Sequence, residues 1–264
     1  MKKLLSSAVL LLLFLSVSGN GVNLLKNGDF SRYKVNWVTN GKVSEEGKAG
    51  FLTLSGKNSR AFSRQVMEID GNKDTLQITA DISADKPVQI YLGLIPADKN
   101  WKEFYFRNTG CVAGTFTVLA SPLVRNTNKV VLKGIVPFKK SAYIAFNAKA
   151  DNSDLPNFQL ERIKSVSTEN GNTIVTLANR IRRSYPAGTS VRCHVDGPTY
   201  LYSSVLRKGF PGKVKASGAV GKAAKVKFRP GTAGVKVCIL LAPVKGAKDV
   251  RAEIRNVRVV KINK

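Results

Sequence analysis

Polar and apolar residues alternate along several segments of this chain, and this period of two is the feature that most limits its fold. The alternation runs over Leu76–Ser83 and recurs in Val88–Leu94 and Val235–Leu241. It is typical of half-buried β-strands, whose successive side chains point to opposite faces. Turn clusters such as Asp70-Gly71-Asn72 and Asn170-Gly171-Asn172 separate the runs. The pattern predicts an all-β protein, a sandwich or a barrel.

The first 19 residues predict export. Lys2 and Lys3 precede an apolar run, Leu4–Val17, which ends among the small residues Ser18 and Gly19. This arrangement is typical of a signal peptide, and the run is short for a membrane span, which needs about 20 apolar residues. No second run of that length follows, so we expect no transmembrane segment and a secreted or periplasmic protein.

The mature chain is expected to form one large sandwich interrupted by a smaller unit. The apolar content of 43% is ample for a core. Residues 158–203 contain an apolar strand, a turn and two further strands, which we interpret as a small inserted β subdomain. Residues 20–157 and 204–264 are then the two parts of the sandwich. A phase change of the apolar residues after Ile254 predicts a bulge near Arg255 and Asn256.

Basic charge is concentrated at the C-terminal end. The chain has 43 Lys and Arg against 17 Asp and Glu, and residues 203–264 contain 16 basic and 2 acidic residues. A field of this sign attracts polyanions; a solvated basic surface without a ligand is the alternative. If the C-terminal strands are neighbours, one basic surface is predicted from Lys213, Lys215, Lys225, Lys227, Arg229, Lys236 and Arg251.

The two ends of the mature chain carry a family resemblance. The segment Asn23-Leu24-Leu25-Lys26-Asn27-Gly28-Asp29-Phe30, followed by Trp37, resembles the opening strand of secreted carbohydrate-binding modules with the galactose-binding-like jelly roll. Glu253–Val260 resembles their closing strand. The resemblance implies a jelly roll that brackets the chain, a last strand beside the first, and a core position for Trp37. The middle of the chain is similar to uncharacterised exported bacterial proteins.

The resemblance also implies a structural calcium in many members of the family. Its acidic ligands are replaced here by Ser31 and by Arg255-Asn256, while Asp29 remains. Calcium needs several oxygen ligands with negative charge, and an arginine repels it. We therefore expect no cofactor and no metal.

In this family, sugars stack on exposed aromatic rings. In the segment Trp101–Phe106, strand alternation predicts that Trp101, Glu103 and Tyr105 share a face, with the alternative that these rings cover a sheet edge. Tyr200 and Tyr202 are expected to share a face of the subdomain, with Arg192 and His194 on the outer face of its preceding strand. Cross-strand packing of the tyrosines is the competing interpretation.

Catalytic signatures are absent from the sequence. His194 is the single histidine, and no nucleophile elbow, zinc signature or phosphate loop surrounds it. The three cysteines, Cys111, Cys193 and Cys238, permit one disulfide or three buried thiols. Export and the lack of a nucleic-acid motif argue against nucleic acid as a partner.

These features predict a secreted, non-catalytic carbohydrate-binding protein. The expected ligand is a polysaccharide, and the basic tail favours an anionic one. Two alternatives remain open. One is a structural or protein-interaction component of the cell surface, and the other is a polysaccharide lyase, which would need a basic groove with a tyrosine or histidine beside an arginine. The oligomeric state is left open.

Overall fold

The computed structural model describes residues 21–46, 49–56, 59–206, 212–243 and 250–262. The predicted signal peptide, residues 1–19, lies outside them. Within these ranges the secondary structure is strand, apart from one turn of 3-10 helix, η1 (Phe106–Asn108). None of the described segments forms a helix with the length and apolar character of a membrane span. The expected all-β class is confirmed.

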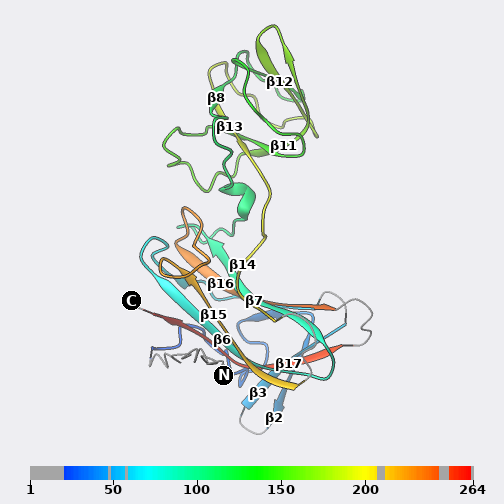
Figure 1. The fold of residues 1–264 in the computed structure, drawn as a ribbon, viewed down its shortest axis with the longest axis vertical. Coiled ribbons are helices and arrows are strands. Elements are labelled where there is room, and N and C mark those ends of the chain that lie inside the picture. Colours follow the sequence, from blue (N-terminus) through cyan, green and yellow to red (C-terminus); the bar gives the residue numbers. More distant parts are fainter. Residues whose placement is uncertain (1–20, 47–48, 57–58, 207–211, 244–249, 263–264) are drawn as a thin grey trace, which may run out of the picture.

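Two antiparallel sheets form the lower body of the molecule (Figure 1). The first, here called the front sheet, has the order β1-β4-β16-β7-β14, with β5 paired to β16. Its strands are β1 (Trp37–Thr39), β4 (Arg60–Ser63), β5 (Met67–Glu68), β7 (Val88–Ala97), β14 (Leu201–Leu206) and β16 (Gly234–Pro243).

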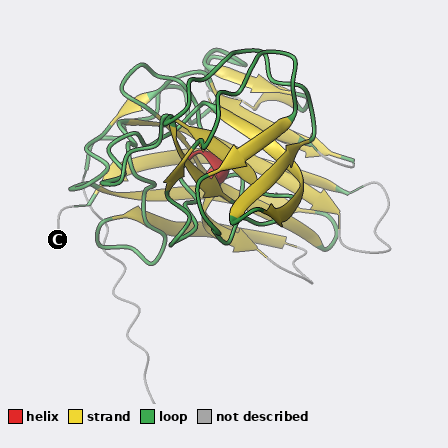
Figure 2. Ribbon diagram, turned by 90° about the horizontal axis from the view of Figure 1, so that it is seen from above, coloured by secondary structure: helices red, strands yellow, loops and turns green. Residues whose placement is uncertain are grey.

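The second sheet, here called the back sheet, has the order β15-β6-β17-β3-β2. Its strands are β2 (Lys42–Glu46), β3 (Ala49–Ser55), β6 (Thr75–Ala84), β15 (Gly212–Gly221) and β17 (Arg251–Lys261). The chain changes sheet between β6 and β7, and again at each step from β14 to β17. This alternation between two facing sheets is the topology of a jelly-roll sandwich. Figure 2 shows the strand layers from above.

The core lies between the two sheets and follows the period of two. In β6, Leu76, Ile78 and Ile82 are buried, whereas Gln77 and Thr79 between them are partly exposed. Val237 and Ile239 of β16 belong to the same apolar cluster from the opposite sheet. The alternating runs of the sequence therefore correspond to the long central strands.

The first described residues lie beside the last strand, β17. The N–H of Leu24 donates to the carbonyl of Val259 (2.8 Å), and the N–H of Val257 donates to that of Gly28 (2.8 Å). The opening segment is irregular rather than a strand. The register of β17 against β6 shifts between Arg255 and Arg258, which is the predicted bulge.

Trp37 belongs to the core, as the resemblance implied. Its side chain is 1% exposed and lies 5.1 Å from the ring of Phe30. The indole N–H donates to the carbonyl of Asn27 at 2.9 Å, which satisfies the polar atom of a buried tryptophan.

A second β unit stands above the sandwich (Figure 1). Its strand order is β8-β13-β10-β11-β12-β9. The strands are β8 (Thr117–Val118), β9 (Lys129–Leu132), β10 (Tyr143–Phe146), β11 (Leu160–Glu169), β12 (Asn172–Leu177) and β13 (Ser190–His194). The Lys133 N–H donates to the Val118 carbonyl, and the Ala120 N–H to the Val131 carbonyl, both at 2.9 Å. These bonds join the two edges, so the unit is a small closed barrel, here called the barrel.

The barrel begins earlier in the chain than the expected subdomain of residues 158–203. Strands β8, β9 and β10 were assigned to the sandwich, yet they pair with β11–β13 and share a separate apolar core with them. The sequence of a short strand does not indicate which strand it pairs with, so these three strands were assigned to the wrong unit. The chain leaves the front sheet after β7 and returns in β14, whose Leu201 pairs with Leu94 of β7. The insertion is thus closed at its base by main-chain pairing.

Replacing Ile254 by alanine should destabilise the sandwich. Ile254 is fully buried in β17, which pairs with β3 and β6, and truncation of such a residue costs about 2–5 kcal/mol. Denaturant unfolding of the purified protein measures this. Arg258→Ala, at an exposed position of the same strand, should change the free energy of unfolding by under about 0.5 kcal/mol. Equal effects of the two substitutions would contradict the assigned core.

Candidate functional site: an aromatic face on the front sheet

The outer face of the front sheet is formed by every second residue of β16. Because Val235, Val237 and Ile239 point into the core, the residues between them point outward. The outward positions are Gly234, Lys236, Cys238 and Leu240. The first and last of them are six residue steps apart, or roughly 20 Å of strand at about 3.3 Å per step.

Four aromatic rings gather over this face. The centroids of Phe62 and Tyr200 lie 6.0 Å apart, those of Tyr200 and Tyr202 lie 6.1 Å apart, and those of Tyr91 and Tyr202 lie 4.9 Å apart. All four side chains are partly exposed. We call these rings, together with Trp101, the aromatic platform. The expectation that Tyr200 and Tyr202 share a face is confirmed, but their face belongs to the sandwich and not to the inserted unit.

Small residues lie under the rings. Across the sheet, Phe62 of β4 is opposite Cys238, Cys238 is opposite Gly93, and Gly93 is opposite Tyr202. A Cβ at Gly93 would lie 2.6 Å from the carbonyl oxygen of Leu201, so the close approach of β14 requires glycine. The two central residues of this row, Cys238 and Gly93, therefore have small side chains or none, and the large rings of Phe62 and Tyr202 lie at its ends.

Trp101 extends the platform toward the start of β16. Its ring lies against Gly234, where an added Cβ would come within 2.6 Å of the indole, and its side chain is 46% exposed. The residue adopts φ +61° in a turn that Asp98 holds by accepting the N–H groups of Asn100 and Lys102. The expected strand alternation of Trp101–Phe106 is therefore wrong. A turn, a single bridge at Glu103 and η1 occupy this segment.

Charged groups lie among the rings. Lys236 donates to Glu103 at 2.7 Å, and the guanidinium of Arg60 lies 5.8 Å from the ring centre of Phe62. Burial raises the pKa of Tyr200, and the nearby Cys238, Tyr105 and Glu103 add to that effect while Arg60 opposes it. Tyr105 and Glu103 thus lie near Tyr200, whereas the sequence had placed Tyr200 on a separate surface of the subdomain. Their polar atoms can donate to and accept from sugar hydroxyl groups.

Arg60, Phe62 and Tyr91 were not predicted as site residues. Tyr91 lies between Ile90 and Leu92 in an alternating run, and Phe62 lies between Ala61 and Ser63 in a shorter one. An aromatic ring at the outward phase of a strand is the signal that would have found them. That β4 lies beside β16 has no local signature.

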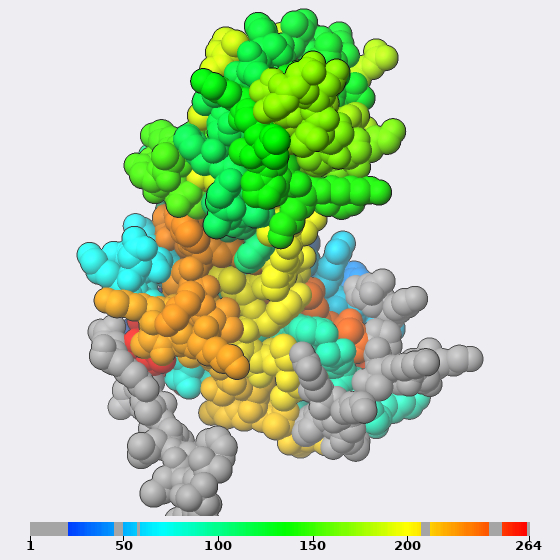
Figure 3. Space-filling model, turned by 45° about the horizontal axis from the view of Figure 1, so that its top comes forward, coloured from blue at the N-terminus to red at the C-terminus, as the bar shows by residue number. Residues whose placement is uncertain are grey.

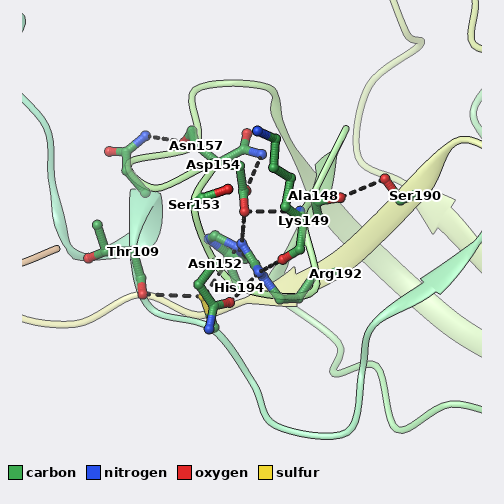
Figure 4. A network of polar contacts seen from close by, with 12 residues as sticks. Thr109, Ala148, Lys149, Asn152, Ser153, Asp154, Asn157, Ser190, Arg192 and His194 are labelled. Carbon is green, nitrogen blue, oxygen red and sulfur yellow. Dashed lines mark hydrogen bonds and ion pairs between the residues drawn. The ribbon is translucent and has the colours of Figure 1, made fainter. Parts of the chain in front are cut away.

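Arg192 and His194 are not on an outer face, contrary to expectation. They are 4% and 0% exposed within the barrel. Figure 4 shows the Arg192 guanidinium at the centre of a polar network. It makes an ion pair with Asp154 at 2.9 Å and donates to the Lys149 carbonyl at 3.0 Å and to the side chain of Asn152. This network ties the loop of residues 149–157 to β13.

His194 is neutral in this network. Its Nδ1 lies 2.7 Å from the carbonyl oxygen of Arg107, so Nδ1 carries the proton, and Nε2 accepts from Arg192 at 3.2 Å. Burial lowers the pKa of His194. Cys111 Sγ is 3.7 Å from Nε2, yet burial raises the pKa of this thiol, which keeps it protonated. The pair lacks the activated thiolate that a nucleophile needs. All three cysteines are free thiols.

The seven basic residues predicted to form one surface are dispersed. Lys213, Lys215 and Arg251 are exposed on the back sheet, whereas Lys225 and Lys227 lie in the turn region that follows β15. Lys236 is on the front sheet, and Arg229 is buried. The residues around Val226 form an irregular segment rather than a strand, which helps to explain the dispersal. The described parts of the chain contain no group of three or more Asp, Glu, His or Cys side chains that could hold a metal ion, either at Asp29 or elsewhere.

No family model and no curated protein matches this chain. Solved structures give weak similarities. The enzymatically active domain of tailspike protein 4 from bacteriophage CBA120 aligns with 91% of this chain at 8% identity and a TM-score of 0.38, but this chain spans only 22% of its length. A protein from Bacteroides thetaiotaomicron, provisionally described as sugar-binding, aligns over 91% and 100% of the two chains at 11% identity and a TM-score of 0.31.

The carbohydrate recognition domain of Emp46p, solved as a point mutant, aligns over 90% of this chain and 94% of its own at 14% identity and a TM-score of 0.29. Two of these three neighbours are thus named for sugar or carbohydrate recognition. The strand pairing described above defines the fold independently of these weak similarities.

Asp154→Asn should destabilise the protein at neutral pH, because it leaves Arg192 buried without its counter-ion, a loss of about 3–5 kcal/mol. Burial opposes the charged form of Asp154, but bonds from Asn157, Lys149 and Arg192 outweigh it and lower its pKa. The stabilisation is therefore complete above about pH 4 and disappears as the pH falls through the lowered pKa. Thermal unfolding of both proteins should converge in acid.

Glu169→Gln is the matched control. Glu169 pairs with Lys129 at 3.3 Å in the same barrel, but both side chains are more than half exposed, so its loss should cost roughly 0–1 kcal/mol. Equal destabilisation by the two substitutions, or a gap between wild type and Asp154→Asn that widens in acid, would contradict the assignment.

Proposed function

We propose that this protein is an exported, non-catalytic polysaccharide-binding protein whose ligand lies along the front sheet. The observation on which this proposal rests is the aromatic platform: five partly exposed rings over one sheet face, with the Glu103–Lys236 ion pair among them. Flat rings offer apolar surface to the C–H faces of sugars, and the charged and hydroxyl groups between them can bond to sugar hydroxyls.

The length of the platform supports a polymer rather than a single sugar. It extends from Trp101 at Gly234 to Tyr91 beside Leu240, along most of β16. A face of roughly 20 Å is longer than one sugar ring. Export by a signal peptide, expected from residues 1–19, is consistent with a ligand outside the cytoplasm.

The ionisation of the tyrosines favours binding over lyase chemistry. A tyrosine that abstracts a proton needs a pKa lowered toward the working pH. Burial raises the pKa of Tyr202 to about 12, and Cys238 and Tyr200 add to the shift. His194 is enclosed in the barrel and its nitrogens are both paired. These groups suit hydrogen bonding to a ligand better than proton abstraction.

A protein partner is the competing function, and the distribution of charge argues against it. The cores of protein interfaces are depleted of charged residues. Here the Glu103–Lys236 ion pair lies among the rings of the platform, and lysine and glutamate are residue types that such interfaces avoid. Alternating rings and polar groups match the two kinds of surface on a sugar polymer.

Trp101→Ala and Tyr91→Ala should each weaken polysaccharide binding by about tenfold or more, since burial of an aromatic side chain contributes about 1.5–3 kcal/mol. Affinity electrophoresis and calorimetry with neutral, carboxylated and sulfated glycans provide the measurement. Binding should persist at moderate salt, because stacking is not screened. An assay for unsaturated products should remain negative.

Phe116→Ala is the control for aromatic content. Phe116 is 44% exposed but lies next to β8 in the barrel, away from the platform, so its removal should leave binding unchanged. Loss of binding in all three variants, or binding that vanishes with salt alone, would refute a platform-based site. Failure to bind any glycan would favour the protein-partner function.

A further inference from the structure

A groove lies where the sandwich meets the barrel. It has a volume of about 450 Å³ and is lined mainly by apolar surface. Its walls come from the chain entering β14, from the segment after β15, and from η1. Figure 3 shows the yellow segment that enters β14 and the orange segment after β15 side by side below the green barrel. The aromatic lining consists of Phe106, Tyr200, Tyr202 and Phe228.

Arg229 is the charged residue enclosed in this lining. Its side chain is only 7% exposed, and its guanidinium carbon lies 5.7 Å from the ring centre of Phe106. Nη1 donates to the Thr199 carbonyl at 3.3 Å, and Nη2 donates to the carbonyls of Pro198 and Thr199. The Nε–H has no acceptor among the described residues. A guanidinium has five N–H donors, so part of its capacity is unused.

The described residues also supply no counter-ion for this arginine. None of the ion pairs of the described residues involves Arg229, in contrast to Arg192, which is buried to a similar degree and pairs with Asp154. Burial lowers the pKa of Arg229 to about 10, so the group is still charged at neutral pH. A buried, charged and incompletely paired guanidinium is costly to a fold. Its position in the lining of an open groove indicates a role toward an anion.

We propose that this groove binds an acidic sugar unit, a uronate, with the carboxylate at Arg229 and the ring among the aromatic side chains. The inference rests on the proposed function and adds the class of polysaccharide. Arginine suits this role because it stays charged and because Nη1 carries a second N–H beside the one that the Thr199 carbonyl accepts. Lys227, exposed at the same groove, adds positive charge.

The groove and the aromatic platform share Tyr200 and Tyr202. A polymer on the front sheet can therefore reach Arg229 at the edge of β14 without leaving the tyrosines. The platform would contribute affinity for the sugar rings, and the groove would distinguish a charged unit from a neutral one. Selectivity for uronates would then depend on one buried cation and not on the dispersed lysines.

The test compares oligogalacturonate with its methyl ester, which has the same rings without the charge. Wild-type protein should bind the acid about ten- to a hundredfold more tightly, as expected for hydrogen bonds to a charged group. Arg229→Gln should abolish most of this preference while affinity for the ester changes by less than about twofold. Arg229→Lys, which keeps the charge but not the guanidinium group, should retain part of it.

Lys225→Gln is the matched control, because it removes one positive charge from an exposed site in the same segment and does not line the groove. Its preference for the acid should equal that of wild type. If Arg229→Gln fails to fold, Arg229→Lys takes its place, and its preference for the acid should fall below that of wild type and of Lys225→Gln. Equal affinity for acid and ester would overturn the uronate inference and leave the proposed function standing, whereas no binding of either these or neutral glycans would refute the proposed function itself.

Discussion

Strand β16 is the element on which the rest of the structure depends, because it is paired on both sides and its two faces have different roles. Its odd-numbered residues, Val235 to Leu241, close the core against the back sheet, and its even-numbered residues form the floor of the platform. Because side chains alternate between the two faces, a shift of register by one residue would place Lys236 in the core and would remove the small residue Cys238 from beneath the rings.

The inserted barrel affects the site by its position rather than by its own side chains. The pairing of β7 with β14 holds the two crossing points of the chain together, so a closed unit of strands β8–β13 can occupy the interval without disturbing the sandwich. The barrel satisfies its own buried charges, as the Arg192–Asp154 network shows. At its base, η1 and the segment Pro198–Tyr200 supply one side of the groove that contains Arg229. The groove is thus a product of the insertion.

Local sequence patterns predicted individual strands well but did not predict which strands pair with one another. The strands over Leu76–Ser83 and Val235–Leu241, the bulge at Arg255 and the burial of Trp37 were predictable, because each depends on local phase or on a family resemblance. The barrel boundary was not, because β8 and β9 are short and pair with distant segments. Trp101 is exposed, as predicted. However, its exposure comes from a turn and not from strand alternation.

Arg229 shows most directly what the sequence alone could not decide. In the chain it is one of many basic residues in a lysine-rich tail, and its charge contributes to a net +26 like any other. The sequence by itself determined the all-β class, the apolar phase of each long strand and the strong positive balance, because these are properties of neighbouring residues. Only the tertiary structure decided which basic group is enclosed, which rings meet across β4, β16, β7 and β14, and which charges are dispersed over separate faces. Pairing between residues more than a hundred positions apart sets these distances, and no local periodicity encodes it.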